Sequence, residues 1–278
     1  MAPPTLSLAS RVPLASGVEI PVLGLGVYQS RPGRETRAAV EAALALGYRH
    51  VDTAKVYGNE ADVGAALAAS GVPRDEVFVT TKLWNDDHGY DTTLRACNAS
   101  LRRLGLDRVD LYLVHWPVHG LRGETWRAME QLVSDGKARA IGVSNYTIRH
   151  LEELLGTARI PPTVNQVELH PFLPQQELAE YCRRHGIVVE AYAPLVKARR
   201  MDHPVLRRIA AKHGATPART LVRWSLEHGY VVIPKSVKPE RIRENADVFG
   251  FALDAEDLAA MDGLDEGFRT SWDPTDVP

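Results

Sequence analysis

The chain has 278 residues, of which 45% are hydrophobic and 24% charged, and its formal net charge is −2. This composition predicts a soluble globular protein with a sizeable core, and the near-neutral charge argues against binding to nucleic acid or to a membrane surface. Cys97 and Cys182 lie far apart in the sequence, and we expect both thiols to be reduced. Met1–Ser10 does not resemble a secretory signal and no apolar run is long enough to span a membrane, so we expect a cytoplasmic protein.

Short apolar runs alternate with longer amphipathic segments along the chain. Eight runs predict strands: Val22–Leu25, His50–Asp52, Val77–Thr81, Val109–His115, Ala140–Ser144, Val164–Glu168, Val188–Tyr192 and Val231–Ile233. The segments between them predict helices, among them Glu35–Leu46, Ala61–Ala69, Thr92–Leu104, Gly123–Asp135, Thr147–Leu155 and Gln175–His185. The glycines that follow several of these helices are typical of helix C-termini: Gly47, Gly105, Gly136 and Gly186.

Eight strand–helix units in about 250 residues are typical of a (β/α)₈ TIM barrel. The alternative is a doubly wound sheet, which normally carries G-x-G-x-x-G after an early strand. Gly24-Leu-Gly26 has no third glycine, so we favour the barrel. We expect Thr5–Ile20, with a turn at Gly17, to form a hairpin that closes the barrel floor. Ala255–Gly263 predicts an extra terminal helix before a polar tail, and residues 1–278 are expected to form a single domain.

Polar groups follow successive predicted strands at the end where TIM barrels carry their active sites. Asp52 ends the second strand and Tyr57 follows it, while Lys82 and His115 end the third and fourth strands. We expect Asp52 to keep Lys82 charged, and Lys82 to lower the pKa of Tyr57. With His115 as a hydrogen-bond donor, Tyr57 would be a proton donor beside a polarised carbonyl group.

Other interpretations of these residues are weaker. Lys82 at a strand end is compatible with the Schiff-base lysine of a barrel aldolase. A protein that binds a cofactor and reports redox state without turnover is a second alternative. Pro117 separates His115 from His119, so they share no helix face and no metal site is expected. Gly142-Val-Ser144 lacks the second glycine of a hydrolase nucleophile elbow.

Over nearly its whole length the chain resembles the aldo-keto reductases, in particular bacterial short-loop members that resemble 2,5-diketo-gluconate reductases. The resemblance rests on motifs in family order: Asp52-Thr-Ala-x-x-Tyr57-Gly-Asn-Glu60, Thr81-Lys82-Leu-Trp84, Leu113-Val-His115-Trp116-Pro117, Ile141-Gly-Val-Ser144-Asn145, Asn165-Gln166-Val-Glu168-x-His170-Pro171 and Ile233-Pro-Lys235-Ser236. It implies reduction of aldehydes or ketones to alcohols by hydride transfer from NADPH. The implied catalytic residues are Tyr57 as general acid, Lys82 and Asp52 as its partners, and His115 beside the carbonyl group.

The predicted cofactor residues come from the strand ends and from the start of the last barrel helix. Tyr192 offers an aromatic face to a nicotinamide, and Ser144, Asn145 and Gln166 suit its carboxamide. Cations near a helix start suit a phosphate, and the resemblance assigns Lys235, Ser236 and Arg241 to the 2′-phosphate. It also assigns further residues to the adenine and to the rest of the cofactor: Glu244, Asn245, Gly26, Val27, Ala193, Leu195 and Val237. Ala193 stands where the family often has serine, so one hydroxyl contact is expected to be missing.

The substrate pocket is expected to be aromatic. By similarity, Trp84, Trp116 and Tyr28 form its walls and His115 its polar end, which suits a small carbonyl compound. The basic stretch Lys197-Ala-Arg-Arg200 is expected to be a solvated loop. We further expect a monomer that needs no protein partner.

Overall fold

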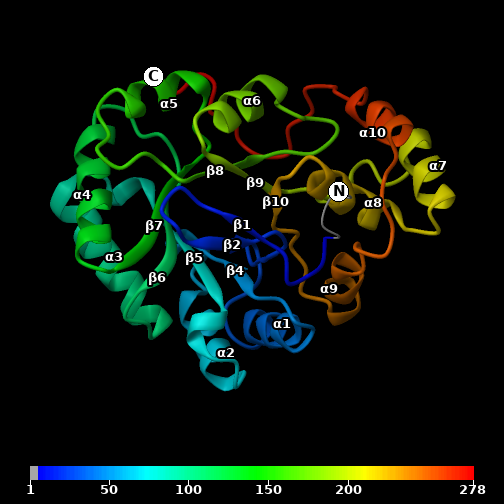
Figure 1. Cartoon of the computed structure of the whole chain (residues 1–278). Helices are drawn as coiled ribbons and strands as arrows, with labels where there is room; N and C mark the ends of the chain where they lie inside the picture. The colour runs from blue at the N-terminus through cyan, green and yellow to red at the C-terminus, as the bar shows by residue number, and fades with distance from the viewer. Residues whose placement is uncertain (1–5) are drawn as a thin grey trace.

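The computed structural model describes residues 6–278, in which strands in the middle are surrounded by helices (Figure 1). Strands β1 (Arg11–Pro13) and β2 (Glu19–Pro21) pair antiparallel as a hairpin. This confirms the predicted Thr5–Ile20 hairpin from residue 6 onward, since Thr5 lies outside the described residues. The remaining strands pair in parallel: β3 (Leu25–Gly26), β4 (His50–Asp52), β5 (Phe78–Leu83), β6 (Val109–Val114), β7 (Ala138–Ser144), β8 (Val164–Glu168), β9 (Val188–Tyr192) and β10 (Val231–Val232).

Helices follow the strands along the chain, as the alternation predicts. The α-helices are α1 (Arg34–Ala45), α2 (Glu60–Ala69), α3 (Tyr90–Leu104), α4 (Arg122–Ser134), α5 (Ile148–Leu155), α6 (Gln176–Arg184), α7 (Pro204–Lys212), α8 (Pro217–Glu227), α9 (Pro239–Ala246) and α10 (Ala255–Asp262). Short 3₁₀ turns are η1 (Lys55–Tyr57), η2 (Arg74–Glu76), η3 (Asn85–Asp87) and η4 (Val196–Ala198). Each of the four predicted C-terminal glycines has a positive φ, which a glycine adopts without strain.

The parallel sheet closes into a barrel, which confirms the predicted fold. Its eight strands pair in chain order from β3 to β10, and the two end strands meet at the bridges Leu23–Val232 and Gly26–Lys235. The backbone N–H of Gly24 also donates to Val232 O at 2.9 Å. A side chain at Gly24 would place its Cβ 2.6 Å from His50 Nδ1, so glycine lets this closing segment pack against the next strand.

Several predicted strand bounds are shifted because pairing with neighbours, and not local composition, decides where a strand begins. Val22–Leu25 overlaps β3 at one residue only, since residues 22–24 contact β10 through isolated bonds and pairing with β4 starts at Leu25. The predicted third strand begins one residue later and extends to Leu83, which places Lys82 inside β5 and not at its end. Strand β6 ends at Val114, so His115 follows the strand.

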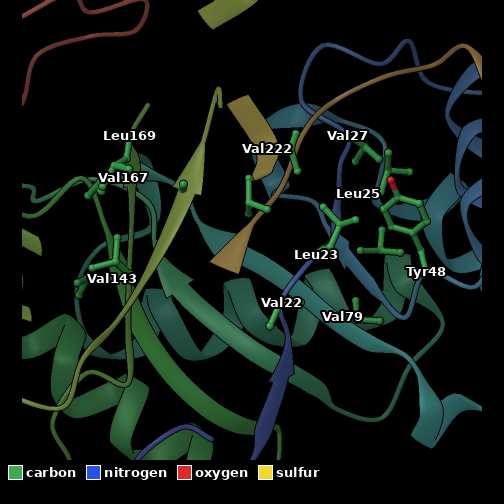
Figure 2. Packing of buried hydrophobic residues seen from close by; sticks show 14 of the residues in the cluster. Val22, Leu23, Leu25, Val27, Tyr48, Val79, Val143, Val167, Leu169 and Val222 are labelled. Carbon is green, nitrogen blue, oxygen red and sulfur yellow. The ribbon is translucent and has the colours of Figure 1, made fainter. Parts of the chain in front are cut away.

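Apolar side chains fill the space on both sides of the strands. Outside the barrel, residues such as Val79, Val143 and Val167 pack in one large core (Figure 2). Inside, Leu111 and Leu113 of β6 belong to a second cluster with Leu14, Val18 and Ile20 of the N-terminal hairpin region. The hairpin therefore closes the barrel floor, as predicted, and leaves the opposite end of the barrel open.

Among the described residues, no helix combines the length and the apolar character that crossing a membrane requires. The expectation of a cytoplasmic, single-domain monomer stays a prediction.

Candidate active site

A cavity of about 650 Å³ lies at the carboxyl ends of the strands. The strand ends bring most of the predicted site residues to this cavity. Its lining includes Gly26, Tyr28, Asp52, Tyr57, Trp84, His115, Trp116, Ser144, Asn145, Gln166, Tyr192, Ala193, Leu195 and Lys235.

Lys82 reaches this site from beneath because side chains alternate along β5. Thr80 and Lys82 are in register with Leu111 and Leu113, the two residues of β6 that face the barrel interior. Lys82 therefore points into the barrel and is fully buried. Its ammonium group lies beneath the cavity, where it reaches the hydroxyl of the cavity residue Tyr57.

The Lys82 ammonium group uses its three N–H donors on three neighbours. It donates to Asp52 Oδ1 at 2.6 Å, to Thr53 O at 3.1 Å and to the Tyr57 hydroxyl at 3.2 Å. The second oxygen of Asp52 accepts from Gln166 Nε2 at 2.8 Å. A buried cation is thus fixed between a buried carboxylate and the Tyr57 hydroxyl at the cavity, and all three of its N–H donors are used.

The pKa of Tyr57 differs from the prediction that Lys82 lowers it. Burial, followed by the negative charge of Asp52, raises the pKa of Tyr57 well above its ordinary value. Lys82, whose charge is paired with the Asp52 carboxylate 2.6 Å away, does not reverse this direction. Tyr57 therefore keeps its proton at neutral pH in this structure.

His115 lies beside Tyr57 at the cavity, with the two ring centroids 5.7 Å apart. Burial and the nearby Lys82 charge hold the pKa of His115 well below its usual range, so the imidazole is neutral. Its Nδ1 atom has no hydrogen-bond partner within the described residues. Asn145 Nδ2 donates to the His115 carbonyl oxygen at 3.0 Å and holds the backbone of this residue in place.

The predicted nicotinamide residues form a hydrogen-bonded group across β7, β8 and β9. The Tyr192 hydroxyl donates to Asn145 Oδ1 at 2.8 Å, and Ser144 Oγ donates to Gln166 O at 2.8 Å. Gln166 Nε2 donates to Asp52 and, at 2.7 Å, to Glu190 Oε2. Because both amide hydrogens of Gln166 are used, its Oε1 atom is the part left to accept a hydrogen bond from a ligand.

The predicted phosphate and adenine residues lie in the segment after β10 and within α9, and most of them are apart from the cavity lining. Lys235 lines the cavity, whereas Ser236, Arg241, Glu244 and Asn245 do not, and neither do Val27 and Val237, which were predicted to contact other parts of the cofactor. Ser236 Oγ accepts from the Lys238 N–H at 3.2 Å just before α9 begins at Pro239. Arg241 is exposed on the first turn of this helix. Glu244 Oε1 accepts from the Thr216 hydroxyl at 2.6 Å.

Sequence reasoning missed parts of the site that distant segments supply. Trp272 and Ser271 from the polar tail line the cavity, and so do Val56 and Lys197. Lys197 belongs to the stretch that the sequence predicts to be solvated, and it is exposed, but its ammonium group also donates to Thr270 O at 2.5 Å. The one signal for the tail was an isolated tryptophan in a polar segment. Glu190, buried beneath Gln166, looked like an ordinary strand residue.

Comparison with known proteins identifies the family. The sequence model of the Aldo/keto reductase family matches residues 22–266. The chain is 50% identical over 271 residues to the glyoxal reductase of Bacillus subtilis (strain 168), and the match covers 98% of each protein.

Solved structures agree with this assignment. The structure of MGS-M4, an aldo-keto reductase from a Medee basin deep-sea metagenome library, superposes with a TM-score of 0.93 at 45% identity and covers 97% of this chain and all of that one. A mutant of Gox0644 solved in complex with NADPH superposes with a TM-score of 0.91 at 44% identity, covering 96% of this chain and 98% of that one. The chain is therefore an oxidoreductase that belongs to the aldo/keto reductase family.

Proposed function

We propose that this protein reduces the carbonyl group of small aldehydes and ketones to an alcohol, with NADPH as the hydride donor and Tyr57 as the general acid. The observation that carries the proposal is the Asp52–Lys82–Tyr57 chain of hydrogen bonds at the cavity. Of the hydroxyl groups that line the cavity, that of Tyr57 is the one bonded to this buried ion pair.

The donor set of the site fits a nicotinamide dinucleotide phosphate. Ser144, Asn145, Gln166 and Tyr192 offer the amide and aromatic groups that suit a nicotinamide, and the oriented Oε1 of Gln166 suits the amide hydrogens of its carboxamide. Lys235, Ser236 and Arg241 bring two cations and a hydroxyl group to the N-terminal end of α9, where the helix dipole also favours an anion, and this suits the 2′-phosphate. Further contacts are assigned to Glu244 and Asn245 at the adenine and to Gly26, Val27, Ala193, Leu195 and Val237 along the cofactor.

When bound, the cofactor supplies the hydride, and the residues of this chain supply binding, orientation and the proton. Tyr57 carries its proton in this structure, which a general acid needs before it can donate to a carbonyl oxygen that develops negative charge. Lys82 is placed to stabilise the phenolate that remains, and Asp52 keeps Lys82 in position. His115, neutral and adjacent, is placed to donate a hydrogen bond to the carbonyl oxygen.

The lining of the cavity indicates the class of substrate. Three tryptophans and Tyr28 surround the catalytic groups, whereas within residues 6–278 the lining includes two cations, Lys197 and Lys235. The lining therefore offers apolar surface to the body of a substrate and few charges to a carboxylate or phosphate. The name of the Bacillus relative makes glyoxal the first compound to test.

The decisive experiment compares Tyr57→Phe with Tyr28→Phe. Both changes remove one phenolic hydroxyl from the same cavity, and the two rings lie 5.0 Å apart, but only the Tyr57 hydroxyl contacts Lys82. We expect Tyr57→Phe to lower kcat for carbonyl reduction by roughly 10²–10⁴-fold, the usual contribution of a general acid. The Kd for NADPH, measured by calorimetry, should stay the same.

Tyr28→Phe should retain most of the activity. Retained turnover in Tyr57→Phe would contradict the assignment of the acid. No oxidation of NADPH by the unmodified protein, across aldehydes, ketones, diketo-sugars and quinones, would contradict the proposed function as a whole.

A further inference from the structure

The segment that follows α10 forms part of the cavity wall. Ser271 and Trp272 both line the cavity, and the Trp272 ring lies 4.7 Å from that of Trp116 between centroids. Trp272 is 58% exposed, so packing against the rest of the protein does not hold its ring by itself. Its position must depend on what fixes the backbone before it.

Glu168, the last residue of β8, fixes this backbone. Its Oε1 atom accepts from the Thr270 N–H at 2.7 Å and from the Thr270 hydroxyl at 2.5 Å, and its Oε2 accepts from the Ser271 N–H at 2.9 Å. His170 Nε2 lies 3.2 Å from the same carboxylate. Burial by itself would raise the pKa of Glu168, but the hydrogen bonds from His170, Thr270 and Ser271 lower it, so these bonds are made to a charged group.

Thr270 also connects the wall to the other side of the cavity. Its carbonyl oxygen accepts from Lys197 Nζ, and Lys197 belongs to the loop after β9 that lines the cavity beside the proposed nicotinamide residues. One residue of the tail is therefore bound both to a strand end of the barrel and to the cofactor-side loop. The buried carboxylate is the rigid end of this connection because Glu168 is 1% exposed.

We infer that Glu168 is a positioning residue for the substrate side of the site: it holds Thr270 and Ser271, and thereby keeps Trp272 as a wall for carbonyl substrates with an aromatic or apolar body. The inference rests on the proposed carbonyl reduction. Glu168 itself does not line the cavity, and it acts through the backbone of the tail.

The test uses Glu168→Gln with two substrates, 4-nitrobenzaldehyde and glyoxal, which differ in the apolar body that Trp272 would contact. We expect the KM for 4-nitrobenzaldehyde to rise about threefold to tenfold more than the KM for glyoxal, the range of one lost aromatic contact. Trp272→Ala should give the same pattern. The double variant should show little further change, because both single changes remove the same wall.

Glu130→Gln is the matched control. Glu130 Oε1 likewise accepts two backbone N–H groups of another segment, those of Arg159 and Ile160 at 2.6 and 3.0 Å, and Glu130 does not line the cavity. This variant should leave both KM values unchanged. If Glu168→Gln fails to fold, Thr270→Val removes one of the three bonds to the tail and should show the same substrate dependence to a smaller extent.

Hydrogen exchange gives a readout that needs no activity. The amides of Thr270 and Ser271 should exchange faster in Glu168→Gln than in the unmodified protein. Unchanged exchange, equal KM shifts for the two substrates, or additive effects in the double variant would each overturn the inference. If the unmodified protein reduces no carbonyl compound, the proposed function fails, while the exchange measurement still tests the anchoring role.

Discussion

The buried ion pair beneath the cavity leads to a quantitative expectation for stability. Lys82 and Asp52 are 2.6 Å apart, and both are almost fully buried. Removing either partner leaves an uncompensated charge in the barrel, which typically costs about 3–5 kcal/mol. Because folded domains have a total stability of about 5–15 kcal/mol, Lys82→Met should lower the unfolding midpoint substantially without abolishing folding.

The double variant separates the charge from the hydrogen bonds. In Lys82→Met combined with Asp52→Asn no charge of the pair remains, and the main loss is that of the bonds to Thr53 O and the Tyr57 hydroxyl. At roughly 1 kcal/mol for each bond, the double variant should lose about 2 kcal/mol. If the costs of the two single variants were additive, the double variant would instead lose about 6–10 kcal/mol.

The measurement is reversible urea unfolding of the four proteins at neutral pH, followed by far-ultraviolet circular dichroism. Lys55→Met is the control, because Lys55 pairs with Asp87 near the same end of the barrel but both side chains are partly exposed. That variant should lose no more than about 1 kcal/mol. If the costs of the two single variants add to within about 0.5 kcal/mol in the double variant, the residues do not act as a pair and the reasoning is wrong.

Three further changes test other parts of the structure. Arg241→Ala should raise the KM for NADPH much more than that for NADH in steady-state assays, and equal effects would exclude it from the 2′-phosphate site. Burial and a nearby carboxylate raise the pKa of Glu190. The pKa of Glu190 is therefore higher in the folded than in the unfolded protein. The contribution of this group to stability is fully present below its unfolded pKa of about 4.3, and it is lost as the pH rises through the folded pKa. Glu190→Gln should therefore raise the melting temperature more at about pH 9 than at about pH 5, and a pH-independent change would count against a buried acid. A Cβ at Gly64 of α2 would lie 2.1 Å from Leu104 O, so Gly64→Ala should cost about 1–3 kcal/mol in urea unfolding, whereas Gly123→Ala in α4, with nothing within 4 Å, should not destabilise.

Much of the fold and site could be predicted because the information is local. An apolar run followed by Asp52, or by His115, indicates a strand and its polar end without knowledge of any other segment. The C-terminal glycines of the helices are equally local. The sequence analysis gives no bounds for helices α7 and α8, although each begins with a proline, a common first residue of a helix.

What could not be predicted depends on contacts between distant segments. The raised pKa of Tyr57 results from burial under neighbouring elements, which has no sequence signal of its own. The backbone beside Trp272, which lines the cavity, is bound by Glu168, 104 residues earlier by numbering. The shifted bounds of β3 and β5 have the same origin, since a strand extends as far as its neighbour pairs with it.

The tryptophans at the cavity also have an optical consequence. Of the five tryptophans in the chain, Trp84, Trp116 and Trp272 line the cavity. Trp126 and Trp224 are buried, and their indole N–H groups are bonded to Ile160 O and Asp262 Oδ1. Indole emission changes with solvent contact, so the cavity tryptophans make the intrinsic fluorescence of the unlabelled protein sensitive to occupancy of the cavity. The emission of the two buried indoles should stay constant, so a change in total fluorescence reports on the cavity tryptophans.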